Sequence, residues 1–311
     1  MKRSGLLGLA LFLSVAFATS GPLRAQDADR FFAFGSGGVK GIYFPIAAEI
    51  CRSVNAHAFA HGYRCGIVAT NGTVENYEGL KDGKLTFAIV QSNAMAARSV
   101  RPPDLATIAA LHPEPLHVAV RASSEIRFLT DLTHRSVNVG VPQSGTRQIA
   151  LALIEVAALD IALDRRLALG PNTQAQRLCD GTVDALFWVS GLGNPSMAEA
   201  HRRCPVRLLE IPADMVDAIF TRVPGLSPMT IPAGTYRNQE DAVATFGPVA
   251  RVVTRADTPG DLVRLLADAI AGDYGDIRRT LPALADLSDA DLARLVPNEV
   301  HHADALTAAV R

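Results

Sequence analysis

The chain has 311 residues, of which 49% are hydrophobic and 20% are charged, and its formal net charge is −1. A chain of this length can form two α/β lobes, each with a core of its own. The near-neutral charge gives no support for binding to nucleic acid or to an anionic membrane surface, so an anionic ligand would have to be held by local groups.

The first 25 residues have the pattern of a secretory signal peptide. Lys2 and Arg3 give a basic start, the apolar run 6–18 is too short to span a bilayer, and small and turn residues lead to Ala25. We expect cleavage after Ala25 and a periplasmic protein, with an uncleaved anchor helix as the alternative. The sequence shows no later segment that is long and apolar enough to cross a membrane.

Four cysteines, Cys51, Cys65, Cys179 and Cys204, lie in the exported part of the chain. An oxidising compartment favours disulfides, and four cysteines allow three connectivities. We favour Cys51–Cys65 and Cys179–Cys204, because each pair flanks one helix-to-strand return and one pair falls in each proposed lobe. Free buried thiols are the alternative. The chain has no Cys-x-x-Cys motif, so neither a zinc site nor a thioredoxin-like site is indicated.

Strands and helices are expected to alternate along most of the chain. Short apolar or alternating runs predict strands at 31–34, 65–69, 85–90, 105–111, 117–121, 136–141, 183–189, 206–211 and 248–254. Helical spacing and cap residues predict helices at 42–55, 74–82, from 146 to near 159, 174–179, after 195, and 259–271, with a helical tail after 276. This alternation implies mainly parallel sheets.

We therefore expect an α/β fold of two lobes with a ligand cleft between them. Residues 26–117 plus 246–311 would form the first lobe, and residues 118–245 the second. Segments 116–121 and 248–254 are expected to cross between the lobes and to act as the hinge.

Small polar residues line three predicted strand-to-helix junctions in the first lobe, at 35–38, 70–73 and 91–93. Ligands of open α/β sheets collect at the carboxyl ends of the strands. Helix N-termini at that edge present free N–H groups and a partial positive charge. The three junctions therefore predict a site for a small, anionic molecule.

Further candidates extend this site to the second lobe. The turn 142–146 supplies hydroxyls, Tyr43 and Trp188 can wall the cleft, and Arg147 opposes its helix dipole unless it has an anionic partner. The predicted ligand-binding residues are Ser36, Gly37, Gly38, Tyr43, Thr70, Asn71, Gly72, Thr73, Asn76, Gln91, Ser92, Asn93, Ser144, Gly145, Thr146, Arg147 and Trp188. The alternatives are simple helix caps, and for Arg147 a solvated surface side chain. Lys40 and Arg98 are weaker candidates.

No motif in the sequence indicates catalysis, a cofactor or a metal. The chain has no G-x-S-x-G elbow, and the run 35–41 is not G-x-G-x-x-G because Lys40 stands at the third glycine. His57 and His61 have a metal-like spacing, but they fall in a polar loop without the glutamate of an H-E-x-x-H motif. We expect a binding protein that is not an enzyme and needs no cofactor.

Six segments in order resemble the TAXI family of solute receptors from TRAP transporters. They are residues 35–45, 70–76, 87–93, 139–146, 184–191 and 231–236. The resemblance implies a type II periplasmic-binding-protein fold and delivery of the ligand to a membrane permease driven by an ion gradient rather than by ATP. The chain departs from the family pattern at Lys40, Phe44 and Thr73.

The resemblance also implies a ligand class, because relatives with this fold bind glutamate-like or dicarboxylate molecules. We expect a small amino acid or organic acid, a TRAP permease as partner, and a monomeric receptor whose cleft edges are free to close. The alternatives are an enzyme of the same fold and a ligand-binding module that serves a sensor or an adhesion partner.

Overall fold

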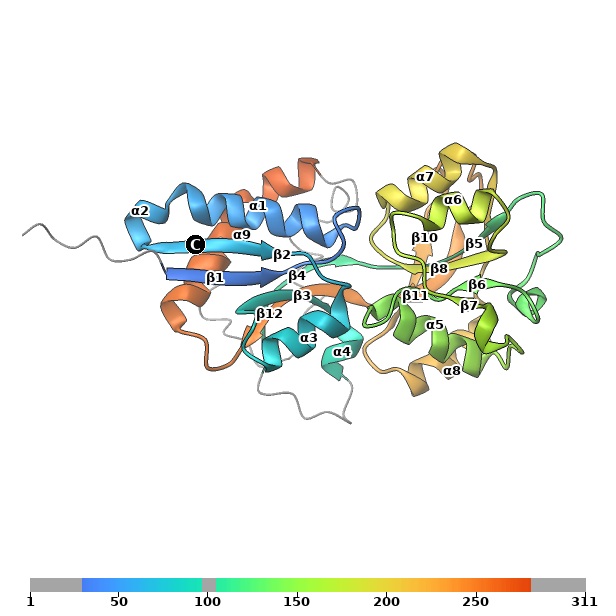
Figure 1. The fold of residues 1–311 in the computed structure, drawn as a ribbon, viewed down its shortest axis with the longest axis horizontal. Helices are drawn as coiled ribbons and strands as arrows, with labels where there is room; N and C mark the ends of the chain where they lie inside the picture. The colour runs from blue at the N-terminus through green and yellow to red at the C-terminus, as the bar shows by residue number, and fades with distance from the viewer. Residues whose placement is uncertain (1–29, 97–104, 281–311) are drawn as a thin grey trace, which may run out of the picture.

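Two five-stranded sheets, each flanked by helices, lie side by side along the long axis of the molecule (Figure 1). The computed structural model describes residues 30–96 and 105–280. The predicted signal peptide, Arg98 and the tail beyond residue 280 lie outside the described residues. None of the helices in the described part of the chain is long and apolar enough to span a membrane.

The first sheet has the strand order β2-β1-β3-β12-β4. Its strands are β1 (Arg30–Gly35), β2 (Tyr63–Val68), β3 (Phe87–Gln91), β4 (Leu105–Pro113) and β12 (Val249–Arg255). Strand β1 runs parallel to β2 and β3, whereas β12 is antiparallel to both of its neighbours. The expected, mainly parallel sheet is therefore mixed, because β12 comes from late in the chain and enters after β11, which pairs with β10.

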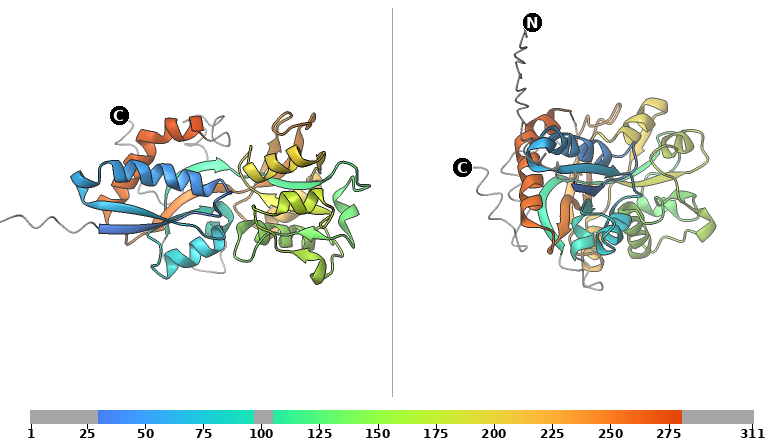
Figure 2. Two further views of the ribbon diagram at one scale, coloured as in Figure 1. Left: turned by 45° about the horizontal axis from the view of Figure 1, so that its top comes forward. Right: turned by 60° about the vertical axis from the view of Figure 1, so that its left-hand side comes forward.

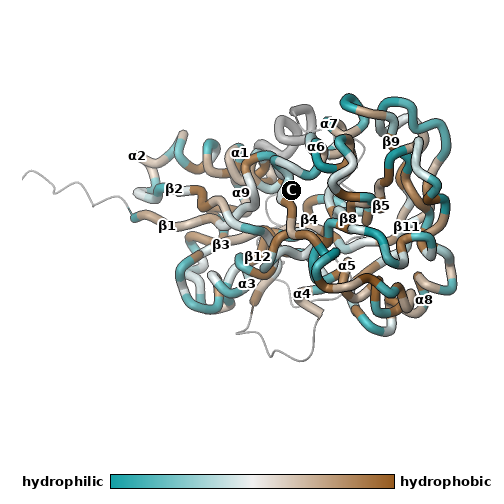
Figure 3. Tube along the Cα trace, turned by 45° about the vertical axis from the view of Figure 1, so that its right-hand side comes forward, coloured by the Kyte–Doolittle hydropathy of each residue, from teal (hydrophilic) through white to brown (hydrophobic). Residues whose placement is uncertain are grey.

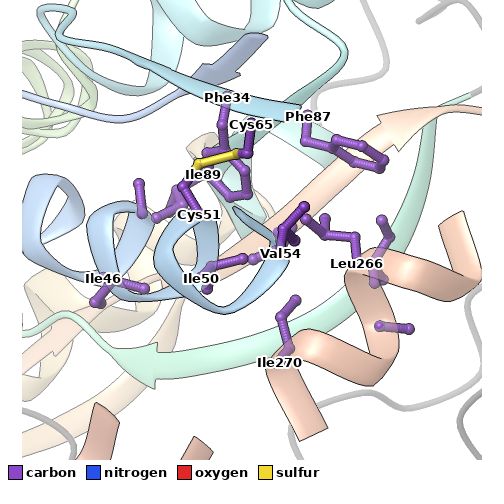
Figure 4. Close-up of a cluster of buried hydrophobic side chains, with 14 of the residues drawn as sticks. Phe34, Ile46, Ile50, Cys51, Val54, Cys65, Phe87, Ile89, Leu266 and Ile270 are labelled. Carbon is purple, nitrogen blue, oxygen red and sulfur yellow. A yellow bond between two sulfur atoms is a disulfide. The ribbon is translucent and has the colours of Figure 1, made fainter. Parts of the chain in front are cut away.

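Helices cover both faces of the first sheet. Helix α1 (Tyr43–Ala56) packs against α9 (Gly260–Thr280) on one face, and the short helix α2 (Ala58–His61) follows α1. Helices α3 (Thr73–Lys81) and α4 (Ser92–Ala96) lie on the opposite face (Figure 1). The apolar stripe of α1 is buried in the core, as its spacing predicts, and Figure 4 shows its members beside Leu266 and Ile270 of α9.

The second sheet has the order β7-β6-β8-β5-β9. Its strands are β5 (Leu116–Arg121), β6 (Val137–Asn138), β7 (Arg166–Leu167), β8 (Ala185–Val189) and β9 (Val206–Leu208). Its helices are α5 (Gly145–Val156), α6 (Gln174–Cys179), α7 (Pro195–Arg203) and α8 (Ala213–Arg222), with 3₁₀ turns at Leu129–Leu132 and Leu163–Arg165. Strands β10 (Ser227–Ile231) and β11 (Val243–Gly247) form an antiparallel pair beside it. Hydrophobic residues concentrate along the strands of both sheets (Figure 3).

The chain passes between the two sheets from β4 to β5 and again from β11 to β12 (Figure 2). The two connections touch, because the backbone N–H of Glu114 donates to the carbonyl of Pro248 at 2.9 Å. The expected crossing segments 116–121 and 248–254 are instead strands within single sheets. Pro115 and Pro248 stand at the connections, where a residue without an N–H does not interrupt a ladder.

Both favoured disulfides are formed. Cys51 on α1 joins Cys65 on β2 with a Cα–Cα distance of 5.1 Å, inside the first core (Figure 4). Cys179 at the end of α6 joins Cys204, which follows α7, at 5.7 Å. The second bridge therefore joins the ends of two helices rather than a helix and a strand. Each bridge closes within one half of the molecule.

Candidate functional site

A cavity of about 270 Å³ lies between the two sheets. The carboxyl ends of β1, β2 and β3 open onto it from one side, as expected for ligand sites of α/β sheets. Its lining consists of Gly37, Gly38, Gly41, Ile42, Tyr43, Thr70, Asn71, Gly72, Thr73, Gln91, Glu114, Val141, Ser144, Gly145, Thr146, Gly170, Pro171, Asn172, Trp188, Val189 and Ser190. The cavity suits a small polar solute better than a drug-sized ligand.

A buried amide fixes the first sheet's edge of the cavity. Nδ2 of Asn76 donates to the carbonyl of Ser36, directly after β1, at 2.6 Å and to that of Ile89, within β3, at 2.8 Å. Its Oδ1 accepts from the hydroxyl of Thr70 at 2.8 Å. Since all these groups are buried, their hydrogen bonds hold the two strand ends and the loop after β2 in one arrangement.

A carboxylate forms part of the cavity wall at the connection between the sheets. Glu114 is 1% exposed, and its Oε2 accepts from the hydroxyl of Tyr43 at 2.7 Å and from Nε2 of Gln91 at 3.0 Å. Burial, and then the adjacent carboxylate of Glu114, raises the pKa of Tyr43 well above its ordinary value. The hydroxyl of Tyr43 therefore keeps its proton and remains a donor.

Helix α5 begins at the second sheet's side of the cavity. Ser144 is its N-cap: its hydroxyl accepts from the backbone N–H of Arg147 at 3.2 Å and donates to the carbonyl of Val141 at 2.7 Å. The hydroxyl of Thr146 accepts from the N–H of Val189 at 3.2 Å, which ties the helix start to the end of β8. Gly145 and Thr146, the first residues of α5, line the cavity.

The two halves of the molecule touch across the cavity. The backbone N–H groups of Val74 and Glu75, in the first turn of α3, donate to the carbonyl of Gln143 at 3.1 and 3.2 Å. Gln143 adopts a left-handed backbone conformation with φ of 62°. Gly145 packs directly against the side chain of Gln91. These contacts describe a closed arrangement of the two lobes.

Most of the predicted ligand-binding residues line the cavity. They are Gly37, Gly38, Tyr43, Thr70, Asn71, Gly72, Thr73, Gln91, Ser144, Gly145, Thr146 and Trp188. Three polar atoms in this set, Oγ1 of Thr73, Oε1 of Gln91 and Nε1 of Trp188, are buried and find no hydrogen-bond partner among the described residues. Such atoms are uncommon in folded proteins, and all three belong to residues that line this cavity.

The other predicted residues, Ser36, Asn76, Ser92, Asn93 and Arg147, are not part of the lining. The side chains of Ser36 and Asn76 make hydrogen bonds to the backbone next to the strand ends. The hydroxyl of Ser92 donates to the carbonyl of Gly225 at 2.6 Å. The guanidinium of Arg147 turns back to the carbonyl of Gly140 at 3.1 Å, so its own loop supplies the partner for the cation.

The remaining lining residues were not predicted from the sequence. They are Gly41, Ile42, Glu114, Val141, Gly170, Pro171, Asn172, Val189 and Ser190. Glu114 is the most informative of them, and its signal was an acid between two prolines at the end of an apolar strand. In the described ranges no cluster of three or more His, Cys, Asp or Glu residues is placed to hold a metal ion.

Comparison with protein families gives a match over residues 34–305 to the NMT1-like family. The chain belongs to this family. It is a family of periplasmic substrate-binding proteins, which agrees with a cavity between two lobes. The fold and the cavity thus agree with the class of protein to which the sequence is matched.

Solved structures show the same two-lobe fold. A protein of Bordetella bronchiseptica RB50 has a TM-score of 0.55 and 14% identity over 90% of this chain and 88% of its own. A putative L-cystine ABC transporter from Listeria monocytogenes has a TM-score of 0.52 and 13% identity, and the match covers 83% of this chain and 97% of that protein. The alkanesulfonate-binding protein of Xanthomonas axonopodis pv. citri bound to MOPS has a TM-score of 0.51 and 16% identity, and the match covers 91% of this chain and 90% of that protein. At these identities the likeness concerns the fold, and it confirms the expected α/β fold of a periplasmic binding protein.

Proposed function

We propose that this member of the NMT1-like family is an extracytoplasmic receptor that captures a small carboxylate or amino acid by lobe closure. The observation that carries the proposal is the set of buried polar atoms without partners around the cavity, from Thr73, Gln91 and Trp188. They come from both lobes, so one solute in the cavity would satisfy them and join the lobes at the same time.

The predicted contact residues that line the cavity are proposed as its ligand-binding set. The backbone N–H groups of Thr73, at the start of α3, and of Gly145 and Thr146, at the start of α5, add donors for a carboxylate, since two helix N-termini lie at the cavity. The lobes are proposed to comprise residues 26–117 plus 246–311 and residues 118–245. A monomer fits this proposal, because closure requires free cleft edges.

Delivery is proposed to be to a TRAP-type permease, on the strength of the six segments that resemble TAXI receptors. The protein would then act in the periplasm after removal of residues 1–25, and it would return its ligand unchanged. Transport by the reconstituted receptor and permease should stop when the ion gradient is collapsed, and transport that instead requires ATP would contradict this part of the proposal.

Native mass spectrometry of the purified protein, followed by denaturation, tests the receptor proposal. We expect a released amino acid or organic acid, and an increase in melting temperature when the same compound is added back. Incubation should leave that compound chemically unchanged. Conversion of the compound would favour an enzyme of the same fold, and a failure to respond to any amino acid or organic acid would contradict the proposed ligand class.

A further inference from the structure

Glu114 is the only formally charged residue in the cavity lining described above. No arginine or lysine of the described residues joins it there, since Arg147 bonds to its own loop and Lys40 is absent from the lining. An anionic group placed near Glu114 would therefore meet a buried carboxylate with no cation between them. Glu114 is therefore the place in this lining where a cationic group of the solute would meet an opposite charge.

The groups around Glu114 hold its carboxylate in place at the cavity wall. Oε2 of Glu114 accepts hydrogen bonds from the hydroxyl of Tyr43 and from Nε2 of Gln91. Its Oε1 lies 3.4 Å from Nε2 of the buried His112. Because Gln91 donates with its nitrogen to Glu114, its Oε1 is turned toward Gly145 across the cleft, where it has no partner. A carboxylate and an amide oxygen thus stand together in the cavity wall.

Donors also line the cavity. Thr73 begins α3, Gly145 and Thr146 begin α5, and the indole N–H of Trp188 is buried without a partner in the described chain. Helix N-termini favour a negative group, so this part of the cavity suits a carboxylate. The cavity wall therefore presents both hydrogen-bond acceptors and donors.

We propose that Glu114 determines specificity by binding a positively charged N–H group of the solute. On this proposal, which rests on the proposed receptor function, the protein takes zwitterions that carry both an ammonium and a carboxylate. It rejects acids of the same size that lack the ammonium, because they would leave the buried carboxylate of Glu114 without a cationic partner. The dicarboxylate part of the expected ligand class is thereby disfavoured.

Matched pairs of compounds that differ only in the amino group test the proposal. The probes are L-glutamate with glutarate, L-aspartate with succinate, and L-leucine with 4-methylpentanoate, each titrated by calorimetry and by thermal shift. For at least one pair we expect the wild-type protein to bind the amino compound at least about tenfold more tightly. Glu114→Gln keeps the shape and removes the charge, and it should reduce that preference by about tenfold or more.

Tyr43→Phe is the control variant, because it removes one hydrogen bond to Glu114 and leaves the carboxylate. It should weaken the binding of both compounds of a pair to a similar extent. If Glu114→Gln lost the same affinity for both compounds of a pair, Glu114 would only support the structure, and the proposal would be overturned. Tight binding of the des-amino acids by the wild type would also overturn it while leaving the receptor function intact. If the protein bound neither the amino compounds nor the des-amino acids, both the proposed receptor function and the proposed role of Glu114 would be contradicted.

Discussion

Thr70 and Thr73, at the junction between β2 and α3, have different roles, although the sequence predicts both as ligand-binding residues. The hydroxyl of Thr70 donates to Asn76 and accepts from the N–H of Gly72 at 3.2 Å. The hydroxyl of Thr73 is buried at the cavity without a partner in the described chain. The first hydroxyl therefore stabilises the fold, and the second carries a desolvation cost that a ligand would offset.

Thr73→Val should separate ligand binding from stability. The substitution removes a buried, unpaired hydroxyl, so the free energy of unfolding without ligand should stay unchanged or rise by up to about 2 kcal/mol, while affinity for the co-purified ligand falls about tenfold. Chemical denaturation and calorimetry measure the two quantities. Thr70→Val is the control and should lower stability by roughly 1–3 kcal/mol. A stability loss in Thr73→Val as large as in Thr70→Val would contradict the assignment.

A histidine behind the cavity makes the fold sensitive to acid. His117 on β5 is fully buried, its Nδ1 lies 3.2 Å from the carbonyl of Trp188, and its Nε2 lies 2.9 Å from the hydroxyl of Tyr236. Burial lowers the pKa of His117 from 6.5 to about 4, and the carbonyls of Trp188 and Pro115 oppose this only in part. The unfolded chain therefore binds a proton at His117 at a higher pH than the folded protein does.

The sign of the pH dependence follows from this lowered pKa. Stability due to neutral His117 is fully present above pH 6.5 and is lost as the pH falls toward 4, by roughly 3 kcal/mol in total. Burial also lowers the pKa of the neighbouring His201, which acts in the same direction. His117→Gln should be less stable at pH 7 but should lose less stability between pH 7 and pH 4.5 than the wild type. Parallel pH profiles of the two proteins in urea denaturation would rule out this role.

At the scale of elements, the start of α5 controls how closely the lobes approach. A Cβ on Gly145 would collide with Oε1 of Gln91 and lie 2.6 Å from its Cδ. Gln91 cannot move aside freely, because it is buried and its Nε2 is bonded to Glu114. The glycine thus permits the contact between α5 and the end of β3.

Gly145→Ala should hold the cleft partly open. We expect ligand affinity to fall at least about tenfold, mainly through faster dissociation, while the unliganded protein melts close to the wild-type temperature. Stopped-flow release and thermal unfolding measure these effects. Gly170→Ala is the matched control in the same cavity, because its Cβ would meet Val141 Cγ1 at an ordinary 3.6 Å. Equal effects of the two variants would show that cavity volume, and not closure, decides affinity.

The sequence predicts the local part of this arrangement well and the long-range part poorly. Apolar runs followed by Gly, Ser, Thr and Asn mark strand ends and helix caps, so Thr70, Ser144 and their neighbours could be found at the cavity. Glu114 could not, because its position depends on β12 inserting between β3 and β4 from far along the chain. Arg147 has the charge expected of an anion contact, but the carbonyl of Gly140 lies within its reach.

At the scale of the whole molecule, each half has a hydrophobic core of its own, and the halves meet around the cavity, at the two connections and where Ser92 bonds to Gly225. The disulfide Cys51–Cys65 lies within the first core, and Cys179–Cys204 joins two helices that cover the second sheet. Neither bridge crosses the cleft, so neither restricts opening and closure. Stability and ligand affinity should therefore respond differently to loss of a bridge.

Removing one bridge should destabilise the half that contains it and leave closure intact. The bridges span sequence separations of 14 and 25 residues, for which chain entropy gives about 3 kcal/mol each. Cys51→Ala with Cys65→Ala, or Cys179→Ala with Cys204→Ala, should lower the melting temperature, whereas ligand affinity measured well below that temperature should change by less than about twofold. Calorimetric unfolding with and without ligand compares the two pairs. The ligand should raise the melting temperature of both variants, because it binds both halves at once. A bridge whose loss weakened binding about tenfold at low temperature would show that its half does not fold independently of the cleft.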